Sequence, residues 1–291
     1  MPLQLWVSVI QIGCFFSLVG LGYYVVLNGA GFFNFAIGPY TMFSGLASSW
    51  LVFIQGWDLP QAILVGIAAT IVLSVLTELL VVRPIERRSG GEELPALIAV
   101  VAVLYAVAQL AGTLFGRRPL PGRPWFYFEN PIQVGLAYID AQVIVSVVVT
   151  LLVFTALSLW LTFSPYGKIM RAVGDNQEAA RTLGFPITRV RVIAFALAGL
   201  IAGIAGPLFA SKAGVGFESG LSYSLFGFIA LVLGGTGSPW APLAGGMLLA
   251  TIQIMSSYFF GSVWLNYATL AIAVVFFAIR PEGIFARRVR A

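Results

Sequence analysis

The chain has 291 residues, of which 59% are apolar and only 9% are charged. Soluble domains carry about 25% charged residues, so this composition excludes a soluble protein and indicates a membrane-embedded one. The sequence has no histidine and one cysteine, Cys14, which argues against a disulfide framework, a cysteine-based metal cluster and most triad chemistry. The net charge of +5 does not indicate a nucleic-acid partner, because the basic residues cluster at the ends of apolar runs.

Apolar runs follow one another along the chain, and a bilayer core needs about 20 apolar residues per helix. The predicted spans are Leu5–Leu27, Phe32–Ile54, Gln61–Val82, Leu94–Phe115, Gln142–Phe163, Val190–Ala210, Leu221–Leu233, Ala241–Phe260 and Val263–Ile279. The first is expected to be a permanent span, since it is longer than a signal-peptide core. The seventh is short enough to be a half-helix. We therefore expect an all-α, polytopic helical bundle with eight or nine spans and broken or short helices, forming one domain over residues 1–291.

Basic residues next to the spans predict the orientation, since they favour the cytoplasmic side. They cluster after the third span, after the fifth span and after the last span. Placing all three clusters in the cytoplasm requires nine spans with the N-terminus outside. The loop 116–141 then lies outside although it contains Arg117, Arg118 and Arg123, so eight spans remain an alternative.

The polar segment 164–189 interrupts the apolar pattern, and its charge density predicts a place in the cytoplasm. Its residues follow a helical repeat, which indicates an amphipathic unit. The polar face comprises Lys168, Arg171, Asp175, Glu178 and Arg181, and the other face comprises Ile169, Val173, Ala179, Ala180 and Leu183. The small, alanine-rich apolar side suits insertion into a groove of a partner. A segment lying on lipid headgroups is the alternative.

Capping residues divide this segment into two short helices. Ser164-Pro165 predicts the first start, and Gly174 is expected to end that helix in the left-handed conformation. Asp175–Glu178 resembles a capping box that opens the second helix. Gly184 ends the second helix, Pro186 prevents its continuation and Thr188 can cap the next span.

Small residues recur at close-packing spacing in the sixth span, as Gly199-x-x-x-Gly203 and Ala202-x-x-x-Gly206. Such residues let helix backbones approach where lipid removes the hydrophobic drive for association. The spacing predicts packing within the chain, with a subunit interface as the alternative.

Glu178-Ala179-Ala180-Arg181-Thr182-Leu183-Gly184 resembles the E-A-A-x-x-x-G motif of bacterial ABC importer permeases. The wider string Gly167–Gly184 looks like that of the branched-chain amino acid permease family. Further elements resemble this family in the same order: Gly31–Gly38, Glu78 with Val82-Arg83-Pro84, Leu233–Ser238 and Arg280–Phe285. Ile37 stands where the family has a histidine, and Tyr40 where it has smaller or acidic residues. These departures bear on the amino acid substrate more than on the transporter class.

The resemblance implies a translocation subunit of the bacterial inner membrane that needs no cofactor and no metal and has no ATPase activity of its own. Consistently, the sequence lacks a G-x-x-x-x-G-K-[ST] nucleotide loop. The implied partners are two cytoplasmic ABC ATPases, a second permease chain that is a paralogue or a copy, an extracytoplasmic solute-binding protein and membrane lipid. In this family the E-A-A helix sits in a groove of the ATPase. The residues expected to couple are Arg171, Asp175, Glu178, Ala179, Ala180 and Gly184.

Glycine-rich breaks at Asn28–Gly31 and Gly234–Pro239 predict broken helices whose free N–H groups face an anionic solute group. Solute-path candidates are Gly31, Asn34, Gly38, Thr41, Gln109, Gly235 and Gly237. For each of them, bonding to neighbouring backbone or simple packing is the alternative. Glu78 lies about one helical turn from Arg83, which predicts that it pairs or snorkels at the interface.

The favoured solutes are branched-chain or other hydrophobic amino acids, with urea, short amides, sugars or another small organic solute as alternatives within the importer class. An ion-coupled secondary transporter would need ionisable residues deep within its spans, and Glu78 is the one such residue here. A membrane transferase or protease is disfavoured because the sequence shows no suitable catalytic constellation.

Overall fold

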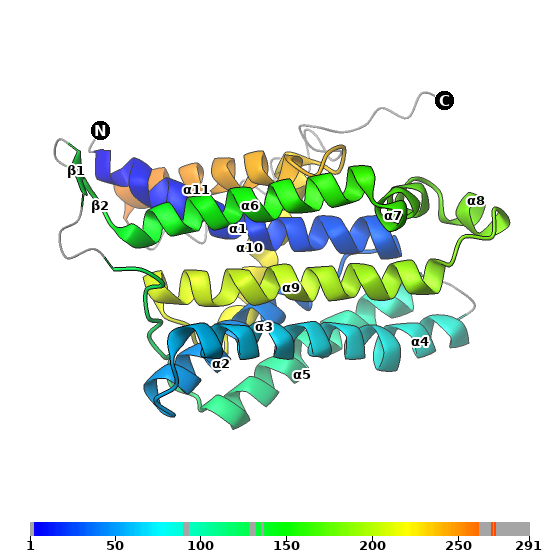
Figure 1. Cartoon of the computed structure of the whole chain (residues 1–291), viewed down its shortest axis with the longest axis horizontal. Coiled ribbons are helices and arrows are strands. Elements are labelled where there is room, and N and C mark those ends of the chain that lie inside the picture. The colour runs from blue at the N-terminus through cyan, green and yellow to red at the C-terminus, as the bar shows by residue number, and fades with distance from the viewer. Residues whose placement is uncertain are drawn as a thin grey trace.

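The structure is a computed structural model that describes residues 3–89, 93–127, 132–134, 137–261, 269 and 271. The helices form one bundle that is longest in the direction in which α1 (Leu3–Ala30) and α9 (Ile187–Ala213) run (Figure 1). The remaining elements are α2 (Ile37–Phe53), α3 (Leu59–Leu76), the π-helical turn η1 (Thr77–Val82), α4 (Arg83–Arg88), α5 (Glu93–Phe115), β1 (Ile132–Val134), β2 (Ala137–Ile139), α6 (Ala141–Phe163), α7 (Pro165–Asp175), α8 (Gln177–Thr182), α10 (Ser219–Gly234) and α11 (Ala241–Phe260).

Six helical stretches of the described residues are long and apolar enough to cross a membrane: α1, α3–α4, α5, α6, α9 and α11. This confirms a polytopic, all-α membrane fold. α2 and α10 have 17 and 16 residues, which at about 1.5 Å per residue falls short of a bilayer core of about 30 Å. α10 matches the short seventh run that the sequence predicts. The ninth predicted span, Val263–Ile279, lies outside the described residues.

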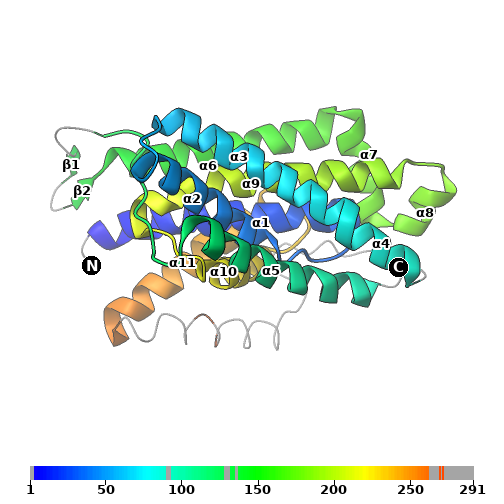
Figure 2. The ribbon, with the colours of Figure 1, turned by 90° about the horizontal axis from the view of Figure 1, so that it is seen from below.

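α1 lies at the centre of the bundle, where it packs against α9, α10, α11 and α6. In its most apolar stretch 67% of the residues are buried, against 28% in α6. Most residues of this stretch of α6 are therefore at least partly exposed, as lipid-facing residues are, although Phe154, Leu157 and Leu161 are buried. α7 and α8 lie at one end of the bundle, and the antiparallel pair β1–β2 lies at the opposite end (Figures 1 and 2).

A break separates α1 from α2, so the second helix starts at Ile37 and not at Phe32 as the sequence predicted. Gly31 ends α1 with φ of 83°, a conformation that favours glycine. Asn34 then forms an Asx-turn, because its Oδ1 accepts a hydrogen bond from the Ala36 amide at 3.0 Å. The chain turns back along α1, since Ile37 packs against Gly22. α2 consequently begins midway along α1.

A second break separates α10 from α11. Gly235 ends α10 with φ of 91°, and the two helices return side by side, with Gly234 packed against the Ala241 backbone. Pro242 at the start of α11 packs against Gly20 of α1. Both breaks therefore reach the same level of α1, in the middle of the bundle.

The small residues of α9 serve packing within the chain, as predicted. A Cβ at Gly199 would lie 2.8 Å from the Thr70 carbonyl oxygen of α3. A Cβ at Gly206 would collide with the Thr41 carbonyl of α2. α9 is thus pressed backbone to backbone against α2 and α3, which leaves no room for a side chain.

Gly206→Ala should destabilise the chain by about 1–3 kcal/mol, because the added methyl overpacks the contact between α9 and α2. Gly216→Ala is the matched control, since a Cβ there would meet Pro119 at an ordinary 3.6 Å. Thermal unfolding in mild detergent measures both. Equal melting temperatures for the two variants would contradict the packing assigned to Gly206.

Candidate functional site

The two short helices α7 and α8 project from the bundle (Figure 1). α7 begins at Pro165, directly after the extended Ser164, as the sequence predicts. The N-cap of α8 is Asn176 rather than Asp175, and its side-chain oxygen accepts a hydrogen bond from an amide of the first turn at 2.9 Å. α8 stops before Gly184, whose φ of 76° is left-handed. Both predicted helices and the glycine stop are confirmed.

Two further predicted caps are also wrong. Gly174 lies inside α7, which continues to Asp175. Gly174 marks a close approach instead, because a Cβ there would lie 2.9 Å from the Asn28 carbonyl oxygen of α1. Thr188 lies in the first turn of α9, and Pro186 is the residue that precedes this helix. The carbonyl of Pro186 accepts hydrogen bonds from the amides of Arg189 and Val190 at 3.0 and 3.1 Å, as an N-cap carbonyl does, so the helix begins directly after it.

The apolar residues of this unit divide between an inner and an outer side. Met170, Val173 and Ala180 are buried against the bundle. Ala179 is exposed on α8, and Leu183, the residue after α8, is 72% exposed. The single apolar face that the sequence predicts is therefore split, and its outward part forms the tip of the projection.

The other predicted coupling residues belong to the same projecting unit. Arg171 is partly buried on α7, Asp175 is exposed at the end of this helix, and Gly184 is exposed after α8. Glu178 lies in α8, but its side chain is outside the described part of the structure. The structure thus gathers the predicted coupling residues at one end of the molecule.

Glycine contacts hold the base of this unit to the bundle. A methyl group at Gly29 of α1 would collide with Ala194 of α9 and would lie 3.3 Å from Met170 of α7. Gly167 lies directly against the backbone of α6. α7 therefore packs closely against α1, α6 and α9 at this end of the bundle.

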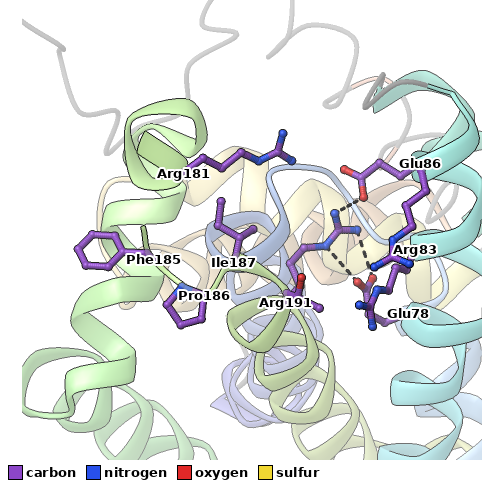
Figure 3. Close-up of a pocket in the computed structure, with 10 residues that line it drawn as sticks. Glu78, Arg83, Glu86, Arg181, Phe185, Pro186, Ile187 and Arg191 are labelled. Atoms are coloured by element: carbon purple, nitrogen blue, oxygen red, sulfur yellow. Dashed lines mark hydrogen bonds and ion pairs between the residues drawn. The ribbon is translucent and has the colours of Figure 1, made fainter. Parts of the chain in front are cut away.

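Arg191 on α9 is the centre of a buried ionic cluster (Figure 3). Its Nε lies 3.1 Å from Oε1 of Glu78 on η1, and its Nη2 donates to Oε2 of the same carboxylate at 3.3 Å. Its Nη1 donates to Glu86 on α4. The guanidinium carbon is 5.9 Å from the ring centroid of Phe32. Arg191 is 5% exposed and Glu78 is 1% exposed, so one side chain joins α9 to η1, α4 and the segment after α1.

The ion-pair partner of Glu78 is thus Arg191 and not the nearby Arg83 that the sequence favoured, and Glu78 does not snorkel outward. The paired residues lie 113 positions apart, beyond the reach of local spacing. The sequence does contain a signal, since ionisable residues within apolar runs pair with one another. Glu78 also lies in a π-helical turn, and such turns occur frequently at functional sites.

A cavity of about 550 Å³ lies beside this cluster, between α4 and the connection from α8 to α9 (Figure 3). Phe185, Pro186, Ile187 and Thr188 form part of its wall. Its charged lining has an excess of positive charge, with four arginines and two glutamates: Glu78, Arg83, Glu86, Arg87, Arg181 and Arg191.

Four of the predicted solute-path residues lie at the first break: Gly31, Asn34, Gly38 and Thr41. The Thr41 hydroxyl donates to the backbone of its own helix at 3.0 Å. Gly38 permits the close contact of α2 with α10. Asn34 is fully buried, and its Nδ2 has no hydrogen-bond partner among the described residues.

Tyr40 adds a second polar group to this buried region. It is fully buried, and its hydroxyl lies beside Asn34, Ser74 and Thr77 without forming a hydrogen bond of good geometry to a described residue. Buried polar groups are normally paired. Asn34 and Tyr40 are therefore two buried polar side chains at the first break whose hydrogen-bonding capacity is not used by the described residues.

The remaining candidates are spread apart. Gly235 is buried at the end of α10, and Gly237 is partly buried in the turn that follows. Gln109 lies on the exposed side of α5, so the structure does not bring it to the breaks.

Comparison with known proteins agrees with this architecture. Residues 6–279 match the family model described as branched-chain amino acid transport system / permease component. The chain belongs to this permease family. It is a multi-pass protein of the cytoplasmic membrane, in keeping with its six helices of spanning length.

Curated relatives cover nearly the whole permease. It is 28% identical to the high-affinity branched-chain amino acid transport system permease protein LivH of Escherichia coli, over 98% of this chain and 96% of that protein. It is 27% identical to BraD of Pseudomonas aeruginosa, another such permease protein, over the same shares. The autoinducer 2 import system permease protein LsrC of an Enterobacter species is 30% identical, over 73% of this chain and 60% of that protein.

Arg191→Met should destabilise the permease by about 3–5 kcal/mol, because it leaves the carboxylate of Glu78 buried without a partner. Arg189→Met is the matched control, since Arg189 is an exposed arginine on the same helix. Thermal unfolding in detergent compares the two. Unfolding of both variants at the same temperature would show that the ionic cluster does not stabilise the fold.

Proposed function

We propose that this permease forms the translocation path of an ATP-binding cassette importer for branched-chain or other hydrophobic amino acids, with α8 as the docking element for an ATPase. The observation that carries the proposal is the projecting α7–α8 unit, which presents Ala179 and Leu183 outward on an E-A-A motif. The printed names of LivH and BraD support the solute class.

This chain has no nucleotide-binding loop of its own, so the proposed importer needs partners that bind and hydrolyse ATP. Two cytoplasmic ABC ATPases supply hydrolysis, a second permease chain completes the path, and an extracytoplasmic binding protein delivers the solute. The permease itself needs neither a cofactor nor a metal and is not an enzyme.

The contacts of the projecting unit support a route for the coupled motion. Closure of the ATPases on ATP displaces α8, and the displacement reaches α9 through Pro186. Arg191 carries it from α9 to η1 and α4 through Glu78 and Glu86, and to the first break through Phe32. Tilting of these segments opens the path alternately to the two sides of the membrane.

The solute path runs past the two helix breaks. Asn34 and Tyr40 offer buried polar groups there, while Gly31, Gly235 and Gly237 let backbone approach the solute and Gly38 lets α10 pack against the first break. Thr41 lies one turn further into α2. Gln109 would contact solute only if a second permease chain covered the exposed side of α5.

The topology we propose has nine spans, with the segment 164–189 in the cytoplasm and the loop 116–141 outside. In this arrangement α2 and α10 are counted as spans although each runs only between one end of the bundle and a break in its middle. The position of the first helix supports it, because Gln4 and Tyr138 of the loop exchange two hydrogen bonds, of 2.9 and 3.3 Å. The N-terminal end of α1 thus lies on the side of this loop, opposite α7 and α8.

Single introduced cysteines should report this topology, because the native Cys14 is 2% exposed and contributes little background. Gln177→Cys should react with a membrane-impermeant maleimide from the cytoplasmic side, and Arg118→Cys from the outside. Labelling of Gln177→Cys on intact cells would overturn the proposed docking role of α8.

Gly184→Val should abolish uptake and uncouple ATP hydrolysis, because valine is strained at a φ of 76°. Gly184→Asn is the matched control, since asparagine tolerates this conformation and a Cβ at this position has no atom within 4 Å. We expect Glu178→Lys to uncouple as well. Uptake and ATPase activity of the reconstituted importer measure the effect, and full uptake by Gly184→Val would contradict coupling through α8.

The similarity to LsrC, together with Ile37 and Tyr40 at positions where the resembled family has other residues, favours a different small organic solute as the second candidate. Uptake of labelled leucine, of a short amide and of a sugar by the reconstituted importer separates the candidates. Uptake of the sugar or the amide without uptake of leucine would replace the amino acid assignment while leaving the importer class intact.

A further inference from the structure

A second cavity adjoins the one beside Arg191. It has a volume of about 390 Å³, and Leu79, Arg83, Pro84, Arg87 and Arg88 line it. Arg83 and Arg87 border both cavities. Together with Arg181 on α8, these arginines form a basic site at the end of the bundle that carries the projecting unit.

The carboxylates nearby neutralise this basic site only in part. Glu78 and Glu86 both form their ion pairs with Arg191, and Glu78 also interacts electrostatically with Arg83, but the four arginines around the first cavity outnumber these two glutamates. Within the described part of the chain, no ion pair involves Arg83, Arg87 or Arg181. The site therefore presents positive charge that a bound anion would balance.

The surface that leads to this basic site is apolar. Val72, Leu76 and Leu80 follow one another at four-residue spacing along α3 and η1 and are 56%, 42% and 68% exposed. Residues four apart lie on the same face of a helix. This exposed stripe runs along the span and ends where Arg83 and Arg87 begin.

We propose that the basic site, formed by Arg83, Arg87, Arg88 and Arg181, binds the phosphate of an anionic phospholipid whose acyl chains lie along the stripe. Basic pockets between helices at the cytoplasmic surface suit such headgroups, and a guanidinium binds phosphate through two parallel hydrogen bonds. A soluble phosphate would contact the arginines alone, whereas a lipid can place its phosphate on the arginines and its acyl chains on the stripe, so the lipid is the occupant that matches both features. A bound lipid would also relieve the repulsion between Arg181 on α8 and the arginines of α4. The proposal is independent of the transported solute.

The test uses the full-length permease in mild detergent, with phosphatidylglycerol, phosphatidylcholine or inorganic phosphate added separately. Lipid retention is measured by native mass spectrometry, and thermal stability is measured in parallel. The variant is Arg83→Gln/Arg87→Gln. Its matched control is Arg118→Gln/Arg123→Gln, which removes two exposed arginines from the loop at the opposite end.

We expect the parent and the control to retain phosphatidylglycerol in preference to phosphatidylcholine and to be stabilised by it. Each arginine near a membrane surface contributes about a fivefold gain in affinity for anionic lipid, so the variant should retain phosphatidylglycerol roughly 25-fold less. Its melting temperature in phosphatidylcholine should equal that of the parent. Equal loss in the control, absence of a preference for phosphatidylglycerol, or stabilisation by inorganic phosphate alone would overturn the proposal.

Discussion

The ionic cluster around Arg191 is the interaction on which the arrangement of the α7–α8 end depends. Removing a charge from water costs several kcal/mol unless a well-placed partner compensates for it. Arg191 meets this requirement with Glu78 and Glu86, and it lies over the ring of Phe32. Three segments that are distant in sequence are thereby held around one guanidinium group. Because Arg191 follows the α7–α8 unit closely along the chain, a motion of α8 would reach the bundle at this cluster.

The two helix breaks obey a related constraint, because backbone groups within a bilayer must find hydrogen-bond partners inside the protein. Asn34 accepts from the Ala36 amide, and Ser224 donates to the Phe35 carbonyl at 2.6 Å. The second of these bonds ties α10 to the first break. Gly38 lies directly against the backbone of α10, so the two short helices meet in the interior. The first break is thus satisfied in part by α10, while Asn34 Nδ2 and the Tyr40 hydroxyl have no hydrogen-bond partner among the described residues.

We propose two different roles for exposed apolar residues near the α7–α8 end of this permease. Along α3 and η1 they form a stripe beside arginines, which matches a lipid with an anionic headgroup. At the tip of the projection, Ala179 and Leu183 lie beside polar residues, which matches a groove on a soluble subunit. The basic site lies between these two surfaces, so lipid and ATPase would meet the permease at neighbouring positions.

Much of the fold follows from the sequence by itself, because apolar length, caps and glycine stops are local properties. They predicted the helices up to α11, the short α10, the two-helix projection, the stop at Gly184 and the packing role of the small residues in α9. The break before α2 was misplaced by five residues, since an apolar segment such as Phe32–Ala36 does not reveal by hydropathy that it is not helical.

The tertiary structure decided what depends on contacts between distant segments. Local spacing paired Glu78 with Arg83, whereas packing of α9 against η1 brought Arg191 to it. A glycine often ends a helix, which is why Gly174 was predicted to do so, but the close approach of α1 makes Gly174 a packing residue. Gln109 was predicted to line the solute path, but α5 places it on its exposed side. In each case helical periodicity says which residues share a face, and only the packed bundle determines what that face meets.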